Sequence, residues 1–224
     1  MRAVDVMVRD VVTIRPDTDV AEAIGLLAKH DVSALPVIDA DGRLAGMLSE
    51  ADLLHRIEIG TERRRPWWLE SLTGASTLAG EFAKAHGRKV GEVMTEGVVA
   101  VGEDTPLADI AALLEKKRIK RVPVLRNGRL VGIVSRSNLI QALASDIGKS
   151  EEHGESDRRI REELLARLAE QEWTDFGDRN VTVSAGVVHL WGLVGSAEEH
   201  KALLALAESV PGVLRVSDEM IAAY

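Results

Sequence analysis

Apolar and polar positions in the first 148 residues follow one pattern that occurs twice. A β-branched run at 11–14, and again at 98–101, predicts a strand. Val20, Ile24 and Leu27 then recur at helical spacing and predict a helix. The first copy continues with a strand at 36–38, a turn at 39–42, a strand at 44–48 and a helix from Ser49. Each copy is therefore expected to be a β-α-β-β-α unit.

The two copies align residue by residue at an offset of 87, which becomes 86 after the turn. A unit of this size buries little apolar surface alone, so two copies are expected to pack as one pseudo-symmetric body. Duplication for stability is one interpretation. A site where the two copies face each other is the other.

The residues between the copies, 58–92, contain an Arg and Trp segment, Arg63–Trp68, and a helical pattern at Leu78, Phe82 and Ala85. Arg with Trp can stack on bases or lie at a bilayer surface. We favour the interpretation in which this segment clamps the linker onto its own domain or a partner subunit.

A polar linker at 149–156 precedes a different pattern at 157–224. A helix with Ile160, Leu164 and Leu168 on one face is followed by two alternating strands, a second helix and a last strand. This pattern predicts a small α-β-β-α-β domain that folds alone, which makes the whole chain an α/β (α+β) protein.

The composition argues against membrane-spanning segments, secretion and metal binding. No run of 18 apolar residues and no secretion signal is seen, so a cytoplasmic location is expected. The chain has no Cys, and its six His lack ligand-like spacing, so no metal is expected.

The net charge of −8 is unevenly placed. Residues 1–150 hold 21 basic and 21 acidic side chains, whereas residues 151–224 hold 7 and 15. Nucleic acid is therefore not an expected partner, and an anionic bilayer is disfavoured for the C-terminal domain.

Each copy ends its second strand with Gly, two apolar residues and Ser, followed three residues later by Asp52 or Asn138. Ser49 and Ser135 then begin helices as caps, with an acceptor three residues on. The same arrangement suits a phosphate beside the Ser and a ribose diol on the carboxylate. Capping and ligand binding are compatible interpretations.

A basic run precedes the second copy's first central strand. Such a run is usually a solvated helix end. Lys120 and Arg121, directly before the apolar residues, are better placed than the others to face an anion.

The duplicated pattern, with "ALPVIDADGRLAGMLSEADL" in the first copy, resembles a tandem pair of cystathionine-β-synthase (CBS) domains at 1–57 and 93–148. The resemblance implies an adenosine nucleotide (AMP, ADP, ATP or NAD) as regulatory ligand in clefts between the repeats, and a homodimer. The residues it implies as nucleotide contacts are Thr13, Ser33, Ala34, Ser49, Asp52, Lys120, Arg121, Ser135 and Asn138. Asn138 departs from the family's acidic residue, so a tight site at Asp52 and a weaker one at Asn138 are expected.

The last domain, with "VTVSAGVVHLWGLVG" and "PGV" at 211–213, resembles a BON domain. The resemblance implies phospholipid or partner binding. The acidic surface and the missing signal peptide favour a protein partner or self-association over a lipid. The expected function is a nucleotide sensor that signals through the BON domain. The alternative is a structural or envelope-linked adaptor in which the CBS pair only dimerises. An enzyme is not expected, because no catalytic domain or nucleophile-base pair remains.

Overall fold

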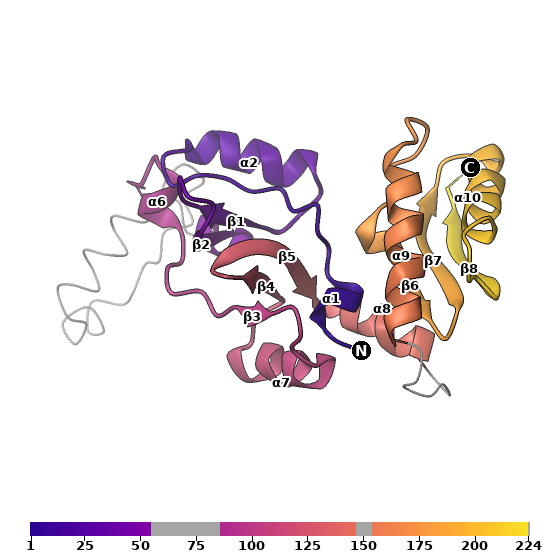
Figure 1. Ribbon diagram of the computed structural model, residues 1–224. Helices are drawn as coiled ribbons and strands as arrows, with labels where there is room; N and C mark the ends of the chain where they lie inside the picture. The colour runs from indigo at the N-terminus through magenta and orange to yellow at the C-terminus, as the bar shows by residue number, and fades with distance from the viewer. Residues whose placement is uncertain (55–85, 147–153, 224) are drawn as a thin grey trace. The chain divides into compact units, whose positions relative to one another are not determined.

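A computed structural model describes residues 1–54, 86–146 and 154–223 (Figure 1). The Arg63–Trp68 segment and the helix expected around Leu78 lie outside these residues. The chain forms two compact units. The first contains Met1–Asp10, Ala100–Leu125 and Val131–Tyr224, and the second contains Val11–Val99 and Arg126–Leu130.

The second unit holds most of the first repeat. Its elements are α2 (Val20–Lys29), β1 (Ala34–Ile38), β2 (Leu44–Ser49) and α3 (Glu50–Leu53). The strands pair antiparallel, and α2 buries its apolar face, including Val20 and Leu27, against them. The run at 11–14 contributes only an isolated parallel bridge between Ile14 and Val37 instead of a full strand.

The second repeat has the same order. Its elements are β3 (Val101–Gly102), α7 (Leu107–Lys117), β4 (Arg121–Arg126), β5 (Arg129–Ser135) and α8 (Arg136–Asp146). Asn127 and Gly128 take positive φ angles of 53° and 79°, as a two-residue hairpin turn requires. The first repeat uses the longer turn 39–42, so the offset changes from 87 to 86 at this point. These elements confirm the expected α/β class.

Each repeat's leading segment packs on the sheet of the other repeat. In the second unit, α6 (Val90–Val93) and Met94 lie in the core beside Leu48. Thr95 exchanges two backbone hydrogen bonds with Met47, of 2.9 and 3.0 Å. A residue from the start of the second repeat therefore extends the first repeat's sheet.

The first unit shows the reciprocal contact. Helix α1 (Ala3–Val6) and Met7 lie in the core of the second repeat. Val8 exchanges two backbone hydrogen bonds with Ile133 of β5, of 2.9 and 3.0 Å. A side chain at Gly132 would crowd this contact, because its Cβ would lie 2.7 Å from the Met7 sulfur and 3.0 Å from the Val8 carbonyl oxygen.

The C-terminal domain has the expected α-β-β-α-β order. Its elements are α9 (Gly154–Ala169), the short helix η3 (Asp178–Asn180), β6 (Val181–Ser184), β7 (Val187–Val194), α10 (Ala197–Glu208) and β8 (Arg215–Ala222). The sheet order is β6-β7-β8, with an antiparallel and then a parallel pair. Helix α9 begins at Gly154, within the stretch expected to be linker. No helix among the described residues is long and apolar enough to span a bilayer.

A fragment of residues 154–224 is expected to melt as one cooperative unit. All side chains of its core, from Ile160 to Met220, come from this part of the chain. Circular dichroism of the fragment during heating checks the expectation. A broad transition without a baseline would contradict it.

Candidate functional site

The first candidate group surrounds the carboxylate of Asp52. The Ser49 backbone N–H and hydroxyl both donate to Oδ2 of Asp52, at 2.9 and 2.7 Å. The Thr95 hydroxyl donates to Oδ1 at 2.8 Å. Both carboxylate oxygens are thus held in place, Oδ2 by two donors and Oδ1 by one.

The other predicted residues of this repeat lie on neighbouring backbone. The Ser33 carbonyl accepts a hydrogen bond from the Glu50 N–H at 3.1 Å. Ala34 is the pairing partner of Ser49 across β1 and β2. Thr13 is half-buried and precedes the residue that bridges to β1. Ser33, Ala34, Ser49 and Asp52 therefore lie together where β1 begins and β2 ends. Thr13 lies closer to the turn end of β1, because its neighbour Ile14 bridges to Val37.

The second candidate group has the same local geometry with an amide in place of the carboxylate. The Ser135 N–H and hydroxyl donate to Oδ1 of Asn138 at 2.9 and 2.7 Å. The Asn138 N–H returns a bond to the Ser135 hydroxyl at 3.3 Å. Asn138 is buried, with 6% of its surface exposed. An Asn at this position therefore performs the capping role without a negative charge.

The two basic residues of this group differ in placement. The Lys120 carbonyl accepts the Arg136 N–H at 3.0 Å, as the Ser33 carbonyl does in the first repeat, and the Lys120 side chain is exposed. Arg121 is the half-buried first residue of β4. An inward orientation toward an anion stays a prediction for both.

Thr95 is a member of the first group that the sequence reasoning missed. It lies 43 positions after Asp52, and only the exchange of leading segments brings its hydroxyl to the carboxylate. At the 87-residue offset its equivalent is Val8, which has no side-chain donor. The pairing of Thr with Asp and of Val with Asn in the two repeats is the signal that could have revealed it.

Comparison with other proteins shows relatives that match the duplicated region. The chain is 33% identical over 139 residues to the chloroplastic CBS domain-containing protein CBSX1 of Arabidopsis thaliana, covering 59% of each protein. It is 33% identical over 135 residues to CBSX2 of the same plant, covering 58% of this chain and 57% of the relative. The chain thus spans less than two thirds of both relatives.

A solved structure supports the same relationship. The crystal structure of CBSX2 in complex with AMP superposes with a TM-score of 0.57 and 30% identity, covering 66% of this chain and 99% of that one.

Family models match both repeats and the C-terminal domain. The CBS domain model matches residues 3–59 and 90–145, and the BON domain model matches residues 156–223. The two CBS matches together cover half of the chain. The resemblances predicted from the sequence are confirmed, and the chain belongs to the CBS domain family, with a CBS pair followed by a BON domain.

Proposed function

We propose that this protein is a regulatory sensor whose CBS pair binds an adenosine nucleotide and whose BON domain signals to a protein partner. The AMP complex of CBSX2 supports AMP as the first ligand to test. In this proposal the protein acts as a binding module in the cytoplasm and not as an enzyme.

The observation that carries the proposal is the hydrogen-bonded Asp52 carboxylate at the end of β2. Its two oxygens are held by Ser49 and Thr95 at 2.7–2.9 Å. A carboxylate held in this way can accept a hydrogen bond from a ribose hydroxyl, and bonds to a charged acceptor are the stronger kind. A preformed acceptor also loses less entropy when the ligand binds.

The equivalent group at Asn138 supports a second, weaker site. Its Oδ1 already accepts two bonds from Ser135, and its NH2 group can only donate. One hydroxyl of a ribose diol would therefore lose a charged acceptor. Lys120 and Arg121 would shift this site toward ligands that carry more phosphate.

Calorimetric titration of the full chain with AMP, ADP, ATP and NAD tests the proposal. Heat of binding with at least one of these ligands is the expected result. The absence of heat with all four would favour the adaptor function, in which the CBS pair serves only as a dimerisation scaffold.

A homodimer is expected because apolar side chains remain exposed on α8. Ile140 and Leu143 lie one turn apart, with 65% and 64% of their surface exposed. Apolar residues that repeat along one helix favour burial against another subunit. Light scattering at micromolar concentration should give about twice the 24.3 kDa mass of the chain.

Replacing Ile140 and Leu143 together by Asp should return the protein to the monomer mass. Ala205→Asp, at an exposed position on α10 of the BON domain, is the matched control and should leave the dimer intact. A wild-type protein that scatters only as a 24.3 kDa particle would refute the dimer.

A further inference from the structure

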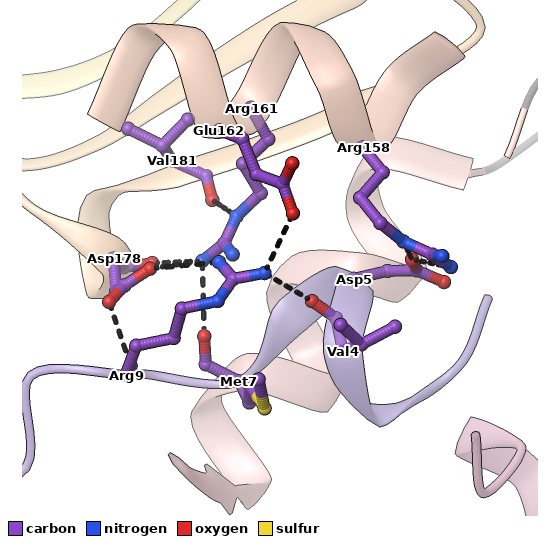
Figure 2. Close-up of polar contacts among 9 residues, drawn as sticks. All are labelled: Val4, Asp5, Met7, Arg9, Arg158, Arg161, Glu162, Asp178 and Val181. Carbon is purple, nitrogen blue, oxygen red and sulfur yellow. Dashed lines mark hydrogen bonds and ion pairs between the residues drawn. The ribbon is translucent and has the colours of Figure 1, made fainter. Parts of the chain in front are cut away.

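Arg161 is an arginine inside the first unit, with 2% of its side chain exposed. Within the BON domain it donates to the carbonyls of Val181 at 3.0 Å and Asp178 at 2.8 Å (Figure 2). It also donates to the carbonyl of Met7, at 3.2 Å, in the N-terminal segment Met1–Asp10. Burial lowers the pKa of Arg161 to about 10, and nearby Asp178 opposes this shift, so the guanidinium stays charged at neutral pH.

Asp178 holds the same segment from the other side. Its Oδ2 accepts the backbone N–H groups of Arg9 at 2.7 Å and Asp10 at 3.3 Å. Its Oδ1 lies 3.3 Å from the Arg161 guanidinium and 3.5 Å from that of Arg9 (Figure 2). One carboxylate therefore binds two consecutive backbone amides and balances two cations.

Two further ion pairs border this contact. Arg158 donates twice to Oδ1 of Asp5, at 2.7 and 3.0 Å, and this bond raises the pKa of Arg158. Arg9 lies 3.5 Å from Glu162. Three arginines thus face three acidic side chains between α9, η3 and the N-terminal segment (Figure 2). The BON domain thus contacts both the backbone and the side chains of the segment Met1–Asp10.

The face of β6 that the CBS part covers carries polar side chains. Val181 and Val183 of β6 face its core, so Thr182 and Ser184 lie on the opposite face of the sheet. Both are buried, and α1 and α8 of the CBS part contact β6. Gln141 of α8 adds a hydrogen bond to the Arg179 carbonyl at 3.2 Å. Polar contacts of this kind are typical of domain interfaces that open and close, because the separated faces are well hydrated.

We propose that the BON domain docks reversibly on the second CBS repeat, with the segment Met1–Asp10 as its docking partner and Asp178 and Arg161 as the latch. Undocking releases the amides of Arg9 and Asp10 and exposes the polar face of β6. The BON core, which has its own side chains, stays folded in both states.

The latch also adjoins the second candidate nucleotide group. Met7 and Val8, which the latch holds, pack on β5, and β5 ends at Ser135. Docking therefore orders the end of β5 and the start of α8, which directly precede Asn138. A ligand there binds better when this ordering is already complete, so docking and nucleotide binding should favour each other. This coupling between docking and nucleotide binding is the second step of the proposal, and it rests on the proposed function.

Amide hydrogen exchange of the full chain, followed residue by residue by NMR without nucleotide, tests the latch. In Asp178→Ala, exchange at Arg9 and Asp10 is expected to speed up by about tenfold or more, because their acceptor is gone. Amides of the BON core, such as those of Val183 and Val188, should keep their wild-type protection. Asp175→Ala is the control, because it removes an exposed acid from the same domain and should change neither set.

Arg158→Gln is a second variant that leaves the buried pair intact. It should speed exchange at Arg9 and Asp10 by less than Asp178→Ala does. Unchanged protection at both amides in both variants would overturn the latch. Loss of protection throughout the BON core in both variants would overturn reversible docking, because the contacts would then be part of the domain's own fold.

Calorimetry with AMP tests the second step separately. Asp178→Ala is expected to weaken AMP binding at the weaker site, beside Asn138, by about fivefold relative to Asp175→Ala, and to leave the affinity at Asp52 unchanged. Equal affinity in the two variants would overturn the coupling. If the wild type binds no AMP, the proposed function fails at this ligand, whereas the exchange result still decides the latch.

Discussion

Asp52→Asn is expected to raise the Kd for AMP at the tight site by about tenfold, equivalent to roughly 1–2 kcal/mol, without lowering the Tm of the protein. The second repeat explains why the fold should tolerate the change. Asn138 accepts both bonds from its preceding Ser, at 2.9 and 2.7 Å, so an amide can preserve the cap. The charge is lost, and the new NH2 group faces the Thr95 hydroxyl, which can accept a hydrogen bond instead of donating one. Calorimetry gives the Kd, and a thermal melt gives the Tm.

Two further variants sharpen this test. Asp52→Ala removes the acceptor altogether and should abolish the tight isotherm, whereas Asn138→Asp should strengthen the weak one. Asp41→Asn is the matched control, because Asp41 is an exposed carboxylate on the turn between β1 and β2. Two equal sites in the wild type, or normal AMP binding by Asp52→Ala, would show that these residues are not the ribose contacts.

Gly46→Ala is expected to destabilise the protein by about 1–3 kcal/mol, because the added methyl group has no room. Its Cβ would lie 2.7 Å from the Met94 sulfur and 2.9 Å from the Thr95 carbonyl oxygen. That carbonyl is fixed by its hydrogen bond from the Met47 N–H at 3.0 Å. The backbone can therefore yield only by breaking the contact between the leading segment and β2.

A urea titration measures this loss, and the Tm should fall by about 5 °C. Gly102→Ala is the control, because the nearest atom to its new methyl group would be 3.9 Å away, at Thr105 Oγ1. Gly132→Ala should resemble Gly46→Ala, since its Cβ would meet Met7 at 2.7 Å. If Gly46→Ala unfolds at the same urea concentration as Gly102→Ala, the packing at Met94 is looser than described.

Local sequence patterns predicted the hairpins and helices of each repeat. Strands β1 and β2 and helix α2 follow directly from alternation, turn residues and helical spacing within about 30 residues. The exchange of leading segments was not predicted. Periodicity shows that a residue such as Met7 is buried, but not that its partner is Gly132, more than a hundred residues later.

The candidate site likewise has local contacts that the sequence predicts and tertiary contacts that it does not. The bonds from Ser49 to Asp52 and from Ser135 to Asn138 span three residues, so the cap signature predicts them. The Thr95 hydroxyl reaches Asp52 only through tertiary structure. Arg161 was not predicted to be buried, because a charged residue beside the apolar face of Ile160 and Leu164 is usually exposed at the surface.

The residues that begin each repeat pack on the sheet of the other repeat, and this arrangement matters during synthesis of the chain. Val8 leaves the ribosome 125 residues before Ile133, its backbone partner in β5. At about 5–20 residues per second, this interval is about 6–25 s. Throughout it, the apolar side chains of Ala3, Val6 and Met7 lack the sheet that covers them. Slow translation or loss of Met1–Asp10 should therefore damage the second repeat first, although the missing residues precede the first.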